Sequence, residues 1–157
     1  MRHAKSSWDD ANLPDFDRPL NTRGQQAAPF MGMVMDQLGL APDVIVCSPA
    51  VRAEQTAVFV KEAGKLRGIL HFEPRIYEAS PNTLRQVVAE IADSNSSAMI
   101  VGHNPGVEGF IRYLTGELES MPTAALAVIE LEIDKWGDVN DGSGKLMTVI
   151  RPKDMMK

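Results

Sequence analysis

Two short apolar runs, at positions 44–47 and 98–101, constrain the fold of this chain most strongly. Continuous apolar runs of this length are typical of strands that are buried on both faces of a parallel sheet. Each run ends in a polar turn, and apolar residues at helical spacing follow that turn. Because strands and helices alternate, the pattern predicts an α/β fold of three layers, α/β/α, with a mostly parallel central sheet.

The remaining elements follow from the same spacing rules. Thr22 is expected to cap a first helix that Gly39 ends, and a pair of strands joined by a turn at Asp141-Gly142 is expected to form an antiparallel edge. Residues 6–23 are polar and predict a loop, in which the acidic side chains are expected to be solvated. The other predicted helices cover 52–64, 81–91 and 105–114, and the other predicted strands cover 71–77, 125–133 and 145–150.

Composition limits the classes of function. The 157 residues predict one domain, 1–157, and the net charge of −5 offers no general attraction to nucleic acid or anionic membrane. The single cysteine and three histidines show no metal-ligand spacing. No apolar run reaches transmembrane length, and the N-terminus lacks a signal-peptide pattern. We therefore expect a cytoplasmic protein with no metal or other cofactor.

Two histidines and two arginines stand at or just after expected strand ends. Arg2-His3 opens the chain, Arg52 follows the first apolar run and His103 follows the second. Ligands of parallel sheets bind at the carboxyl ends of strands, where helix N-termini also favour phosphate. A neutral imidazole is a nucleophile, and arginine grips phosphate oxygens with its planar fork. The set predicts phosphoryl transfer through histidine, although each residue alone has an ordinary structural explanation.

Three segments carry a resemblance to a known family. Segments 2–6 (RHAKS), 48–57 (SPAVRAEQTA) and 102–106 (GHNPG) resemble the motifs of the histidine phosphatase superfamily, whose fold is that of the phosphoglycerate mutases. Segments 5–8, 17–20 with 23–24, and 77–80 are similar to those of its SixA-like phosphohistidine phosphatases. The resemblance covers nearly the whole chain and implies the same fold.

The resemblance also implies a mechanism. His3 would attack phosphorus and become phosphorylated, while Arg2, Arg52 and His103 would hold the equatorial oxygens. Water would then release phosphate, and no metal is implied. Arg18, Ser6 and Asn104, which belong to matching segments, are expected to contact the substrate.

The proton donor and the substrate stay open at this point. Glu78 stands where larger relatives keep a general acid, but it is equally well explained as a solvated residue near a helix start. We expect the substrate to be a phosphohistidine in a signalling or phosphocarrier protein. The alternatives are small phosphate monoesters, or a phosphate-binding protein with little turnover.

The resemblance has one departure, at the start of the chain. The family places an apolar central strand directly before its Arg-His pair, whereas here only Met1 precedes Arg2. We therefore expect the first strand to be missing or truncated, the sheet to be gapped, and the natural chain to start about ten residues earlier, the length of a strand with a short lead.

Overall fold

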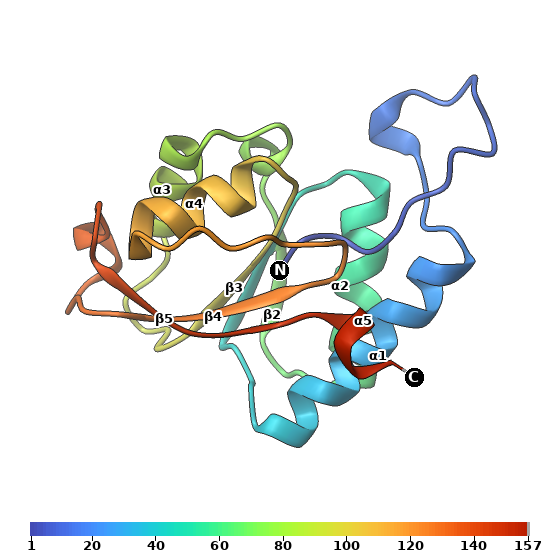
Figure 1. The fold of residues 1–157 in the computed structure, drawn as a ribbon. Coiled ribbons are helices and arrows are strands. Elements are labelled where there is room, and N and C mark those ends of the chain that lie inside the picture. The colour runs from blue at the N-terminus through green and yellow to red at the C-terminus, as the bar shows by residue number, and fades with distance from the viewer. Residues whose placement is uncertain (157) are drawn as a thin grey trace.

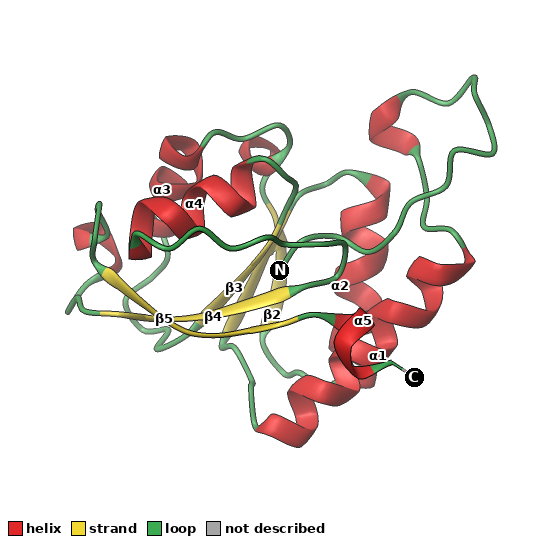
Figure 2. Ribbon diagram, viewed as in Figure 1, coloured by secondary structure: helices red, strands yellow, loops and turns green. Residues whose placement is uncertain are grey.

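The computed structural model describes residues 1–156, and five strands and five helices are found in that part of the chain (Figure 2). Short 3-10 turns lie at Asp15–Asp17, Pro74–Ile76 and Trp136–Asp138. The strands are β1 Val44–Cys47, β2 Ile69–Phe72, β3 Ala98–Val101, β4 Leu126–Leu131 and β5 Gly144–Ile150. The helices are α1 Thr22–Leu38, α2 Val51–Ala63, α3 Pro81–Ala89, α4 Gly106–Thr115 and α5 Pro152–Met155.

The strands form a parallel group and an antiparallel pair. β1 lies between β2 and β3 and is parallel to both, with Val44 opposite Ile69 on one side and Ala98 on the other. β4 and β5 are antiparallel, with an irregularity between Val128 and Ile129. The predicted buried strands and the predicted antiparallel pair are confirmed.

Helices cover both faces of this strand layer (Figure 1). On one face, α1 and α2 pack on β1 and β3 through a cluster that includes Met31, Val60 and Ile45. On the other face, α3 and α4 pack through a second cluster that includes Leu84 and Phe110. The three-layer α/β/α prediction is confirmed. The strands are apolar along their length because helices bury both of their faces.

Residues Met1–His3 join the two groups of strands. The Met1 α-amino group donates to the Ile100 carbonyl over 2.7 Å, and the His3 amide donates to the Gly102 carbonyl over 3.0 Å. On the other side, the Arg2 amide donates to the Ala125 carbonyl. The segment thus takes the central position between β3 and β4, although it forms one parallel bridge rather than a strand.

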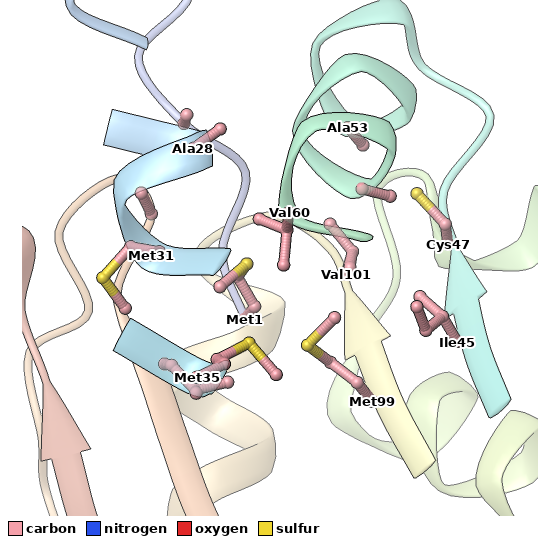
Figure 3. Packing of buried hydrophobic residues seen from close by; sticks show 14 of the residues in the cluster. Met1, Ala28, Met31, Met35, Ile45, Cys47, Ala53, Val60, Met99 and Val101 are labelled. Atoms are coloured by element: carbon pink, nitrogen blue, oxygen red, sulfur yellow. The ribbon is translucent and has the colours of Figure 1, made fainter. Parts of the chain in front are cut away.

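An apolar cavity of about 730 Å³ lies between β3 and β4, beside Met1. The Met1 side chain lies inside the core, among the methionines of α1 and Met99 (Figure 3). Burial of its α-amino group lowers the pKa of that group to about 5. The gap expected in the sheet is therefore present as this cavity, and His3 is nevertheless held by backbone hydrogen bonds on both sides of its segment.

Two local predictions were wrong. Asn21, not Thr22, caps α1, because its side chain accepts a hydrogen bond from the Gly24 amide over 2.9 Å. The strand predicted over 71–77 ends at Phe72, and a 3-10 turn follows it. Pro74 has no amide hydrogen to donate to a neighbouring strand, which explains the early end.

Candidate active site

The structure brings His3 and His103 together at the carboxyl end of the parallel strands. Their ring centroids are 5.1 Å apart, and both residues are buried. His103 follows β3, and the bridge between Arg2 and Gly102 places His3 beside it. Arg52 lies in the first turn of α2, just after β1, and is also buried. These residues therefore lie together at the carboxyl ends of the strands, as the sequence predicted.

His3 is held as a neutral imidazole. Its Nδ1 lies 2.7 Å from the Ala4 carbonyl oxygen, which only accepts hydrogen bonds. Nδ1 therefore carries the proton, and Nε2 keeps a free electron pair. Burial lowers the pKa of His3 to about 3, opposed by the Ala4 hydrogen bond and reinforced by the charges nearby. At neutral pH the ring is uncharged and Nε2 is available to attack.

His103 is buried, and its two ring nitrogens have different surroundings. Its Nε2 lies 2.8 Å from Ser48 Oγ, and that oxygen accepts a hydrogen bond from the Ala50 amide. Ser48 is fully buried, and among the described residues Nε2 is the one acceptor within reach of its proton, which assigns the ring proton of His103 to Nδ1. Within residues 1–156, Nδ1 is buried and has no hydrogen-bond partner. Burial, followed by the charge of Arg52, lowers the pKa of His103 to about 4.

Arg2 adds a second buried donor without a partner. Its Nη1 donates to the Met121 carbonyl oxygen over 3.0 Å, which orients the guanidinium. Its Nε is buried and has no hydrogen-bond partner in the part of the chain that the structure describes. Burial lowers the pKa of Arg2 from its usual value. Unpaired buried donors are costly, so an oxyanion that accepts from them would be stabilised.

Arg52 and Arg18 share one partner, Asp15. Arg52 donates from Nη1 to the Asp15 carbonyl oxygen (2.7 Å) and from Nη2 to Oδ2 (3.0 Å). Arg18 donates from Nη1 to Oδ1 over 2.9 Å and stacks on the Trp8 ring at 3.2 Å. The predicted substrate-contacting residue Ser6 accepts from Arg18 Nη2 over 2.6 Å. Two of the predicted phosphate ligands are thus tied together by a carboxylate.

Asn104 and Glu78 occupy different settings. Asn104 Nδ2 donates to Glu108 Oε2 over 2.6 Å and to the Met121 carbonyl oxygen over 3.0 Å, so its amide holds the loop beside Arg2. Glu78 is exposed, has a positive φ of 57° and directly follows Tyr77. Their predicted roles, substrate contact and general acid, stay predictions.

Comparison with known proteins identifies the family. The family model of the histidine phosphatase superfamily (branch 1) matches residues 1–84 of this chain. The chain belongs to the histidine phosphatase superfamily. An uncharacterised protein of Mycobacterium tuberculosis is 30% identical over 158 residues, which cover 94% of this chain and 96% of that protein.

Solved structures of this superfamily are similar to the chain over its length. A proposed phosphohistidine phosphatase, SixA of Agrobacterium tumefaciens, is 28% identical with a TM-score of 0.82, covering 97% of this chain and 95% of that one. The protein histidine phosphatase SixA in complex with tungstate is 23% identical with a TM-score of 0.85, covering 98% and 96%. The resemblance to the SixA-like branch is therefore confirmed.

Three further residues of this histidine phosphatase site were not predicted as such. Asp15 was expected to be a solvated loop residue, but its carboxylate accepts from both arginines and from the Tyr77 hydroxyl, the last over 2.6 Å. The Tyr77 ring packs edge-on against His103 at 5.5 Å. Ser48 contacts His103. In the sequence, Ser48 and Tyr77 stand inside motif segments, whereas Asp15 lies in the loop predicted over residues 6–23 and carries no such signal.

Neither a metal cluster nor a spanning helix is found among residues 1–156. No group of three or more histidine, cysteine, aspartate or glutamate side chains there is arranged to hold a metal ion. No helix there is long and apolar enough to cross a membrane. The site is built instead from an uncharged imidazole and from cationic and neutral N–H donors, a set suited to holding an oxyanion.

Proposed function

We propose that this histidine phosphatase superfamily member hydrolyses phosphohistidine in a cytoplasmic signalling or phosphocarrier protein, through a phosphorylated His3. The observation that carries the proposal is that His3, whose Nε2 has a free electron pair, lies in one site with two buried donors, Arg2 Nε and His103 Nδ1, that have no partner among residues 1–156. A nucleophile beside preorganised donors is what phosphoryl transfer requires.

In the first step, His3 Nε2 attacks phosphorus in line. A bond forms between phosphorus and Nε2 as the bond between phosphorus and the substrate nitrogen breaks. The substrate imidazole takes up a proton from solvent as it leaves. Arg2, Arg52 and His103 hold the equatorial oxygens, and their N–H groups compensate the charge that develops there.

In the second step, a water oxygen attacks phosphorus and the bond to Nε2 breaks. Inorganic phosphate leaves, the released proton passes to solvent, and His3 returns to its neutral form. The Ala4 carbonyl keeps the ring oriented through both steps, since it accepts from Nδ1 and not from the reacting nitrogen.

The substrate class follows from the leaving group. An imidazole leaves readily once protonated, whereas the alkoxide of a sugar phosphate needs a positioned acid. Glu78, the proposed acid, has an exposed side chain, and its carboxyl has no hydrogen-bond partner among the described residues. This setting favours phosphohistidine over small monoesters. Similarity to structures of proteins named SixA supports the same class.

The test compares two substrates and two variants. Phosphate release is measured from a phosphohistidine-carrying protein and, in parallel, from p-nitrophenyl phosphate. The wild-type chain is expected to prefer the protein, and His3→Ala is expected to abolish release. His71→Ala is the matched control, because His71 is exposed on β2. Preference for the ester, lost in Glu78→Gln, would favour the monoester function; phosphate binding without turnover would indicate a binding protein.

A further inference from the structure

The carboxylate of Asp15 lies where two arginines and a phenol converge. Arg52 Nη2 and Tyr77 Oη both donate to Oδ2, over 3.0 and 2.6 Å, and Arg18 Nη1 donates to Oδ1 over 2.9 Å. The Asp15 backbone carbonyl accepts a further bond from Arg52 Nη1. One anion thus receives three side-chain donors, two of which are cationic, as a phosphoryl group would.

The partners of Asp15 are fixed, whereas Asp15 itself is not enclosed. The side chains of Arg18 and Arg52 are 8% and 9% exposed, and that of Asp15 is 50% exposed. Arg18 is further held by Ser6, by the Ser7 carbonyl and by the Trp8 ring. Asp15 stands on a three-residue 3-10 turn within an exposed loop. Of the groups in this cluster, Asp15 is therefore the one that can turn into solvent.

We propose that Asp15 is an internal anion that occupies the phosphate-binding arginines in the resting enzyme and must be displaced by the phosphoryl group. This inference rests on the proposed function, because it assumes that Arg52 and Arg18 bind the substrate. It assigns to Asp15 the control of how tightly the site binds an oxyanion.

Displacement also releases Tyr77. Its ring stays packed edge-on against His103 and against Phe16, both within 5.5 Å between centroids. Its hydroxyl, once free of Oδ2, is a donor at the edge of the His3 and His103 pair. Tyr77 would then transfer its hydrogen bond from the Asp15 carboxylate to the phosphoryl group.

The experiment measures binding of inorganic phosphate to the full chain by titration calorimetry. Asp15→Asn keeps the shape of the side chain and removes its charge. We expect this variant to bind phosphate about tenfold more tightly, because apparent affinity is proportional to the fraction of time for which the site is open, and tenfold corresponds to a wild-type site open about one tenth of the time. Asp17→Asn removes the same charge from the same turn, where Asp17 is exposed, and is expected to bind within about twofold of wild type.

Each result supports or overturns the proposal. Asp15→Glu, which restores a carboxylate, is expected to return the affinity toward the wild-type value. Equal or weaker binding by Asp15→Asn would overturn the proposal, and weaker binding would mean that Asp15 positions the arginines. In turnover, the proposal requires the KM of Asp15→Asn to fall more than its kcat changes. Failure of folded wild-type and variant chains to bind phosphate would instead reject the proposed site itself.

Discussion

Ser48 Oγ lies 2.8 Å from His103 Nε2, and both residues are buried at the carboxyl ends of neighbouring strands. The contact joins residues 55 positions apart in the sequence. Ser48 accepts from the Ala50 amide, and among the described residues His103 Nε2 is the one acceptor within reach of the Ser48 proton. This arrangement places the ring proton of His103 on Nδ1, which is the donor in the proposed mechanism.

Ser48→Ala is therefore expected to lower kcat/KM about tenfold, the cost of one lost buried hydrogen bond. The ring of His103 would lose its fixed tautomer, so the pH profile of kcat/KM would also shift. Steady-state kinetics from pH 5 to 9 test this, with Ser94→Ala as control, since Ser94 is exposed. An unchanged pH profile would contradict the assigned role of Ser48.

Arg52→Lys keeps the positive charge and removes the planar fork. We expect kcat/KM to fall by about 100-fold, because a lysine cannot replace two parallel donors to an oxyanion. Arg67→Lys is the control, since Arg67 is exposed. Activity within threefold of wild type would show that charge alone is sufficient at this position.

The free energy of unfolding is expected to fall as the pH decreases from about 7 to 4. The pKa values of His3 and His103 are lowered by burial to about 3 and about 4, so the unfolded chain takes up protons near pH 6.5 while the folded chain does not. Their contribution is complete above the unfolded pKa and is lost toward the folded one. Each histidine adds at most about 1.4 kcal/mol per pH unit.

Urea unfolding at pH 7, 6, 5 and 4 measures this slope. His3→Asn is expected to reduce the dependence on pH, whereas His71→Asn, at an exposed position, is expected to preserve it. The same slope in wild type and His3→Asn would rule out His3 as a source of the acid sensitivity.

Gly24→Ala is expected to destabilise the fold by about 1–3 kcal/mol, the usual cost of overpacking. A Cβ at this position would lie 2.2 Å from the Lys5 carbonyl oxygen, in the segment that carries His3. Thermal unfolding of Gly24→Ala and Gly137→Ala compares this with a glycine whose nearest neighbour would lie 4.0 Å away. Similar melting temperatures for the two variants would disprove the close approach.

Filling the cavity between β3 and β4 is expected to stabilise the protein. An extended apolar segment of about five residues added before Met1 would replace the buried α-amine, which is uncharged at neutral pH, with an amide that still donates to Ile100. We expect the melting temperature to rise by about 5 °C. A Gly-Ser extension of equal length is the control, and an equal effect of both extensions would argue against insertion between the strands.

The layers of the fold and the edge of the sheet that carries the candidate site were predictable from the sequence. The runs at 44–47 and 98–101 are apolar throughout because helices cover both faces of the sheet. A strand buried on both faces needs apolar residues at consecutive positions, and this pattern is visible in the sequence. Since parallel strands share one carboxyl end, residues that follow them, such as Arg52 and His103, must meet. The motif segments added the family and the role expected of His3.

The pairing of groups within that site depends on how the chain folds. Asp15 and Tyr77 are 62 positions apart in the sequence. No local pattern distinguishes Asp15 from the other acidic residues of the loop over residues 6–23. Asp15 and Asp17 share one 3-10 turn, and it is the Asp15 carboxylate that accepts from Arg52. The same holds for the Ser48 contact with His103 and for the capping of α1 by Asn21. Such pairings depend on distances between chain segments, which local residue patterns do not encode.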